Sequence, residues 1–92
     1  LLPHVLAFNL QALGPKADRI AAQAGLASGQ ALPQAMADLV RRIGIAPRLR
    51  DLGVARHQLE AMAAAALQDN AHKTNPRPMR QEDYLSVLLA AY

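Results

Sequence analysis

The sequence predicts an all-α fold in which about five helices pack as a small bundle. Apolar residues recur at helical spacing through most of the chain, and no segment alternates β-branched residues as a strand does. Hydrophobic residues make up 52% of the 92 positions, but alanine is the commonest of them and Phe8 is the only phenylalanine. Small apolar side chains favour closely packed helices, so we expect one small domain.

The N-terminal half contains three predicted helices. The first covers Leu1 to Asn9, and a break follows at Gly14-Pro15, because proline suits the first turn of a new helix. The second starts at Pro15 and ends at Gly25. The third lies within residues 28–44, and its apolar face is formed by residues at helical spacing, namely Leu32, Met36, Leu39, Val40 and Ile43.

The C-terminal half begins with a short helical turn at residues 48–52, which Gly53 ends in a left-handed conformation. A longer helix is predicted over residues 56–69. Residues 70–78 are predicted to form a loop, because two prolines in this segment prevent a continuous helix. The last helix starts near Glu82 and Asp83, whose carboxylates favour a helix N-terminus, and runs to Tyr92.

The first residues form an apolar run with no initiator methionine and no polar lead-in. We therefore expect Leu1 to be a cut end and the chain to need a partner, namely a preceding part of the same protein. No stretch approaches the roughly 18 apolar residues of a membrane-spanning helix, and no cysteine is present, so we expect a cytoplasmic protein without membrane contact.

The three histidines are candidate metal ligands: His4, His57 and His72. Two imidazoles on one helix converge on a metal only at a spacing of three or four residues, and no pair here has that spacing. Asp69 and His72 have it, but they straddle a predicted helix end, where a solvated terminus is the more ordinary interpretation. His4 lies in an apolar run, which favours a core histidine bonded to the backbone.

The one concentration of positive charge consists of Arg41, Arg42, Arg48 and Arg50. With a net charge of +3, these residues leave open a helix-turn-helix that binds phosphates. A structural role is the preferred interpretation, because Arg41 and Arg42 lie in a predicted last turn, where cations face the negative end of the helix dipole. Arg50 is also placed to pair with Asp51. We therefore expect no nucleic-acid partner.

Three segments together resemble one family. LPHVLAFN at residues 2–9 resembles the LPHV-x-x-(F/Y)-N segment of iron-containing (group III) alcohol dehydrogenases. LRDLGV at residues 49–54 is similar to their LRD-(L/I/V)-GV turn, and TNPRP at residues 74–78 followed by Glu82-Asp83 is similar to their TNPRP-x-x-x-ED ending. The resemblance extends from Leu1 to Tyr92.

The resemblance implies that residues 1–92 are the C-terminal part of a metal-binding helical domain of the dehydroquinate-synthase-like type. Members of the family transfer a hydride between an alcohol and NAD(P), and one aspartate and three histidines hold a divalent metal, iron or zinc. In the family these ligands and the nucleotide-binding glycines precede the segment that matches Leu1. The resemblance thus assigns no catalytic, cofactor-binding or metal-binding residue to this chain.

Two positions carry further expectations. The loop before Asn75 lies near the substrate channel in relatives, so His72 is the one residue expected close to that channel. Arg80 stands where relatives often have a helix-capping threonine or serine, so we expect the last helix to be capped less well.

The predicted function is therefore that of a fragment of an NAD(P)- and metal-dependent alcohol dehydrogenase, inactive by itself, from a parent that acts on a small alcohol or aldehyde and forms a homo-oligomer. A maleylacetate reductase fragment is the nearest alternative. Two alternatives come from other functional classes. One is a small basic module that binds DNA or protein, and the other is an autonomous structural domain.

Overall fold

The computed structural model describes residues 1–92 and is entirely helical, which confirms the predicted fold class. The five α-helices are joined by four short 3-10 helices, η1 to η4. The α-helices are α1 (Leu2–Leu13), α2 (Pro15–Gln23), α3 (Leu32–Arg42), α4 (Leu59–Gln68) and α5 (Gln81–Ala90). The 3-10 helices are η1 (Gly29–Ala31), η2 (Leu49–Leu52), η3 (Arg56–Gln58) and η4 (Asn70–Thr74).

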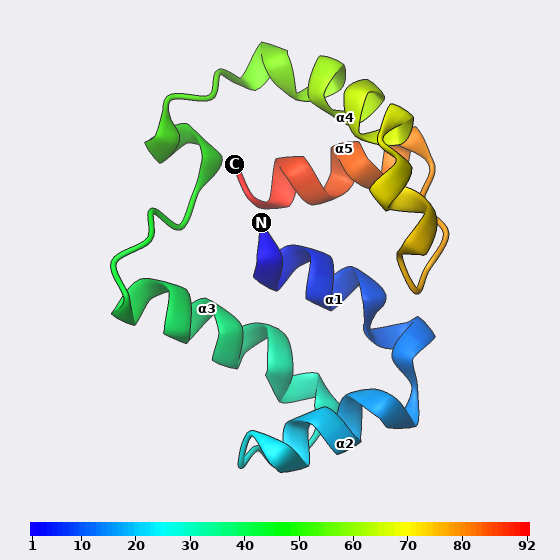
Figure 1. Ribbon diagram of the computed structural model, residues 1–92. Helices are drawn as coiled ribbons and strands as arrows, with labels where there is room; N and C mark the ends of the chain where they lie inside the picture. Colours follow the sequence, from blue (N-terminus) through cyan, green and yellow to red (C-terminus); the bar gives the residue numbers. More distant parts are fainter.

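The helices form a layer in which α5 packs between α4 and α1, while α3 and α2 lie beyond α1 (Figure 1). The two ends of the chain lie near each other in the middle of the layer. Next to the C-terminus, the Leu49 N–H of η2 donates to the Ala91 carbonyl at 2.9 Å. This bond fixes the connector from α3 to α4 against the end of α5.

Two predicted element bounds are wrong. The first helix continues past Asn9 to Leu13, and it ends only because Gly14 takes a φ of 51°. The segment predicted as a loop contains η4, because the Asp69 carboxylate caps it by accepting the Ala71 N–H at 2.8 Å. Both prolines of that segment follow η4, where they interrupt no helical hydrogen bond.

The chain has two small hydrophobic cores. One joins α1, α2 and α3, where Ala17, Ala21 and Leu32 are buried. The other joins η2, α4 and α5 around Leu59 and Ala63. Only Leu59 among the large side chains is almost fully buried. The many alanines therefore bring helices close together, as the composition predicts, but they give each core little apolar bulk.

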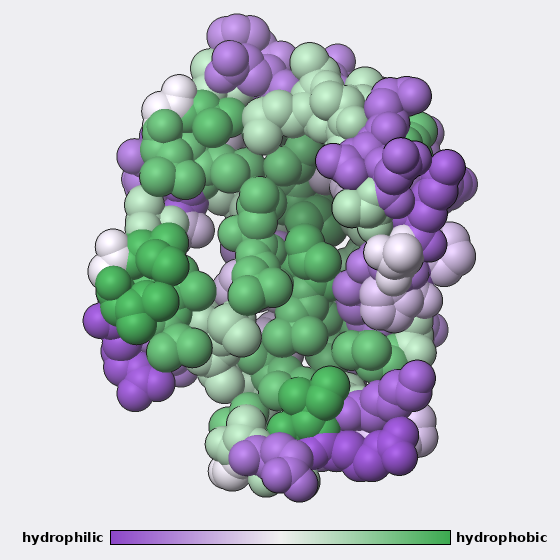
Figure 2. All heavy atoms as spheres, in the orientation of Figure 1, coloured by the Kyte–Doolittle hydropathy of each residue, from purple (hydrophilic) through white to green (hydrophobic).

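The molecule is a thin slab that leaves apolar side chains exposed. Its extents are 38 × 30 × 17 Å, and its radius of gyration of 14.0 Å exceeds the roughly 12.3 Å typical of a compact domain of this length. The exposed surface of 6269 Å² likewise exceeds the roughly 5,200 Å² expected for this mass. Apolar surface runs through the middle of the face in Figure 2. Ile43 and Leu52 are 61% and 65% exposed.

No helix of the structure has the length and apolar character that crossing a membrane requires.

The N-terminus of α5 lacks a side-chain cap, as expected. Arg80 is the N-cap residue, and its side chain makes no capping hydrogen bond. Asp83 compensates in part, because its Oδ2 accepts the Arg80 backbone N–H at 2.8 Å. The Arg80 guanidinium also lies 3.7 Å from Asp83, but this exposed ion pair contributes little stability.

Gly29 is required by a close approach between η1 and α2. Its N–H donates to Asp18 Oδ1 at 2.8 Å. A Cβ at this position would lie 2.6 Å from the Ala17 Cβ and 2.9 Å from the Ala17 carbonyl carbon. Any larger residue must therefore push α2 away and break the bond to Asp18.

We expect Gly29→Ala to lower the free energy of unfolding by about 1–3 kcal/mol, the usual cost of overpacking a closely packed contact. Urea denaturation measures this change. Gln30→Ala is the matched control, because Gln30 is exposed on the same 3-10 helix. Equal stability of the Gly29→Ala variant and the control would show that the approach of η1 to α2 is not tight.

Candidate functional site

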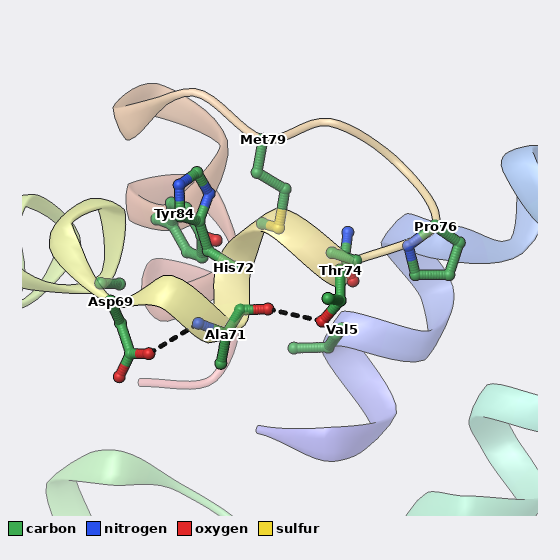
Figure 3. Close-up of a pocket in the computed structure, with 10 residues that line it drawn as sticks. Val5, Asp69, Ala71, His72, Thr74, Pro76, Met79 and Tyr84 are labelled. Atoms are coloured by element: carbon green, nitrogen blue, oxygen red, sulfur yellow. Dashed lines mark hydrogen bonds between the residues drawn. The ribbon is translucent and has the colours of Figure 1, made fainter.

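A depression with partly apolar walls lies where α1, α4 and α5 meet the segment between α4 and α5. It is open to solvent and has a volume of about 470 Å³ (Figure 3). Its lining combines apolar and polar side chains: Val5, Ala66, Asp69, Ala71, His72, Thr74, Asn75, Pro76, Met79 and Tyr84. We call residues 69–79 the pocket segment, because most of the lining belongs to it.

Local hydrogen bonds shape the first half of the pocket segment. The Asp69 carboxylate accepts the Ala71 N–H at 2.8 Å, and the Thr74 hydroxyl donates to the Ala71 carbonyl at 2.9 Å. The His72 N–H donates to the Asp69 carbonyl at 3.3 Å. Asp69 thus acts as a helix cap, in agreement with the interpretation of Asp69 and His72 as a helix terminus.

His72, the residue singled out in the sequence, lies in the wall of this pocket. Its ring packs edge-on against Tyr84 of α5, with ring centroids 6.1 Å apart and an interplanar angle of 68° (Figure 3). Its Nδ1 atom is buried and has no hydrogen-bond partner. The His72 side chain makes no hydrogen bond, so packing against Tyr84 places its ring, although an unpaired buried nitrogen is costly.

Tyr84 belongs to the same wall, although the sequence analysis did not single it out. Burial raises the pKa of Tyr84 above its ordinary value, and the negative charge of Asp69 raises it further. The phenol therefore stays protonated and able to donate a hydrogen bond. Buried Met79 adds apolar surface to the pocket, so a ligand would meet a mostly apolar surface with a few polar groups.

The second half of the pocket segment is held against α1 by polar contacts. Asn75 and Asn9 exchange two side-chain hydrogen bonds of 2.8 Å each. Arg77 donates from a guanidinium nitrogen to the Phe8 carbonyl at 3.0 Å, and its guanidinium carbon lies 3.9 Å from the Phe8 ring centre. We call these four residues the clamp. Sequence reasoning placed them in two motifs but did not predict that the motifs touch.

The other two histidines lie elsewhere. His4 is half-buried on α1, and the prediction that it bonds the backbone is wrong, because its Nδ1 is buried without a partner. Burial, and then the charge of the Leu1 amino group, lower the pKa of His4. His57 is exposed on η3. No group of three or more His, Cys, Asp or Glu side chains is arranged to hold a metal ion.

Among the four arginines of the basic concentration, Arg41 forms an ion pair. Arg41 lies in the last turn of α3 and pairs with Asp38 one turn earlier. A hydrogen bond from Gln34, and then one from Arg41, lower the pKa of the Asp38 carboxyl. This supports the structural interpretation of Arg41. The expected pairing of Arg50 with Asp51 is not formed.

Comparison with known proteins places this architecture in a family. The model of the Fe-containing alcohol dehydrogenase family, C-terminal, matches residues 1–92. The chain therefore belongs to the Fe-containing alcohol dehydrogenase family, as its three motifs predict.

Three similar proteins show the range of the family. Lactaldehyde reductase of Escherichia coli (strain K12) is 36% identical over 100 residues, which cover 100% of this chain and 26% of the relative. 4-Hydroxybutyrate dehydrogenase of Cupriavidus necator is 34% identical over 92 residues, with coverages of 96% and 24%. Maleylacetate reductase of Burkholderia cepacia is 35% identical over 89 residues, with coverages of 97% and 24%. The chain thus spans about a quarter of the length of these relatives.

We expect Tyr84 to ionise above its ordinary pKa, because the folded protein holds the phenol proton more tightly than the unfolded chain does. The raised pKa destabilises the fold only when the pH exceeds the ordinary value of about 10, because below it the phenol is neutral in both states. The difference in tyrosinate absorbance between the unmodified protein and Tyr84→Phe, followed against pH, measures this pKa. Ionisation at or below the ordinary value would contradict the burial of Tyr84 in this wall.

Proposed function

We propose that this chain forms the C-terminal helical part of a larger oxidoreductase that is NAD(P)- and metal-dependent and transfers a hydride between a small alcohol and its aldehyde. The observation that supports this most is that one family model matches all 92 residues. The relatives named as dehydrogenases and reductases are about four times as long as this chain. We further propose that the parent protein is a cytoplasmic homo-oligomer.

The slab shape supports the view that the chain is one layer of a larger protein. Apolar side chains as large as Ile43 and Leu52 are exposed, and each of the two cores is small. A chain with so little buried bulk gains stability by covering its apolar face with more protein. We propose that the preceding part of the same protein covers this face and carries the nucleotide-binding domain.

We assign the metal and NAD(P) to that preceding part, because the family resemblance places their ligands ahead of the segment that matches Leu1. The three histidines of this chain lie on α1, η3 and η4, and the nearest carboxylate to His72 along the chain, that of Asp69, is used as a helix cap. This arrangement supports the proposal that a divalent metal, iron or zinc, is held by ligands outside these 92 residues. No chemical step is assigned to residues of this chain.

The role proposed for this chain is to form one wall of the substrate channel. His72 and Tyr84 line an open, mostly apolar pocket, which suits a small substrate with one or two hydroxyl or carbonyl groups. A maleylacetate reductase is the second candidate, because two such enzymes are among the similar proteins at 35% and 37% identity. A DNA-binding module is less favoured, because Arg41 is engaged by Asp38.

The proposal predicts different behaviour for the isolated chain and the full-length parent. We expect the parent to turn over 1,3-propanediol or lactaldehyde with NAD(H) or NADP(H) in the presence of iron or zinc. The isolated 92-residue chain should show no turnover, a broad thermal transition and strong binding of an apolar dye to its exposed face. Co-expression with the preceding part should remove the dye binding.

Two results would contradict the proposal. Turnover by the isolated chain would show that it carries catalytic residues. Salt-sensitive binding of the isolated chain to duplex DNA, measured at two salt concentrations, would favour the basic module instead.

A further inference from the structure

The clamp joins two segments that are far apart in the sequence. Asn9 and Asn75 are 66 residues apart, yet each side-chain amide donates to the other's oxygen at 2.8 Å. Asn9 is only 8% exposed, although asparagine is usually found at the surface. A buried amide is tolerated because both of its polar atoms are paired.

The orientation of the pair is fixed by the backbone. The Asn75 Nδ2 also donates to the Arg77 carbonyl, so this atom must be the nitrogen and not the oxygen of the amide. The Asn9 side chain must then present its own oxygen to Asn75 Nδ2 and its nitrogen to Asn75 Oδ1. A substitution that removes either amide therefore leaves a polar atom of the other without a partner.

Arg77 forms the second arm of the clamp. Its guanidinium lies 3.9 Å from the Phe8 ring centre and also donates to the Phe8 carbonyl at 3.0 Å. A planar guanidinium is suited to both contacts at once, whereas an ammonium group is not. Arg77 thus covers one turn of α1 next to the amide pair.

The clamp provides every hydrogen bond between residues 70–79 and another helix. The remaining bonds of these residues are local: Thr74 bonds Ala71, and the Asn75 N–H bonds the His72 carbonyl. Packing alone fixes the rest, including the contact of His72 with Tyr84. Val5 of α1 lines the same pocket, so the distance between α1 and the pocket segment, which the clamp bridges, bears on the width of the pocket.

We infer that Asn9, Asn75 and Arg77 are positioning residues, which hold the pocket segment against α1 and thereby set the width of the pocket and the place of His72. The effect on substrate rests on the proposed function, because it requires this pocket to line the substrate channel. The effect on the position of the pocket segment is independent of the proposed function.

The test uses the full-length protein with Asn9→Ala, Asn75→Ala, the double variant and Arg77→Lys. Asn70→Ala is the matched control, because Asn70 is exposed at the start of η4 and has no part in the clamp. The first measurement is amide hydrogen exchange at His72 and Asn75, compared with amides of α3. The second is KM and kcat for 1,3-propanediol and 4-hydroxybutyrate.

We expect exchange in the pocket segment to accelerate by at least about fivefold in Asn9→Ala and Asn75→Ala, which lose both bonds of the pair, and by about three- to tenfold in Arg77→Lys, while α3 stays unchanged. The double variant should exceed either single variant by little, because both single variants break the same pair. KM should rise by a similar factor with kcat preserved, because a displaced wall weakens ground-state and transition-state binding alike.

Unchanged exchange in the pocket segment, or equal acceleration in α3 and in the pocket segment, would overturn the inference, because the clamp would then be absent or merely add global stability. A fall in kcat at constant KM would also overturn it, since that is the result of losing folded enzyme. Accelerated exchange with unchanged KM would retain the clamp and refute the proposed place of this pocket beside the substrate. Arg77→Lys keeps the amide pair and remains informative if the alanine variants do not fold.

Discussion

The structure depends on a polar connection between two small cores. The core of α1, α2 and α3 and that of η2, α4 and α5 are each built around alanines and a few leucines. Between them, α1 packs beside α5, and the clamp adds the paired amides of Asn9 and Asn75. Where apolar bulk is scarce, buried and fully paired polar groups specify which helices meet, because no alternative contact satisfies both amides.

The same scarcity of bulk explains the shape of the molecule. A helix layer 17 Å thick is little more than one helix with its side chains, so no second layer of this chain covers its faces. Ile43 and Leu52 are among the large apolar side chains left exposed. The family relationship gives this observation a meaning, since the chain spans about a quarter of the length of its relatives. Shape and family membership thus both support the proposal that the chain is one layer of a larger protein.

The local features of the sequence predicted most of the helices. Gly14 followed by Pro15, Gly44 and Gly53 mark helix ends in the structure as they do in the sequence, because a positive φ is available to glycine at little cost. Two other predictions failed because each depended on a single hydrogen bond. The Asp69 cap creates η4 inside a predicted loop, and His4 lacks the backbone bond that its apolar surroundings suggested.

The sequence by itself determined the fold class and the family, and it singled out His72 as a residue to examine. Helical periodicity and short motifs are properties of neighbouring residues and can be recognised without a structure. Only the tertiary structure decided what His72 touches: Tyr84, twelve positions later, packs against its ring, and this contact makes a pocket wall. Likewise, LPHVLAFN and TNPRP are visible as separate motifs, but their Asn9 and Asn75 are paired only by folding. Contacts between distant residues depend on how the helices pack. Sequence motifs and periodicity describe only local structure, so they do not predict which distant residues meet.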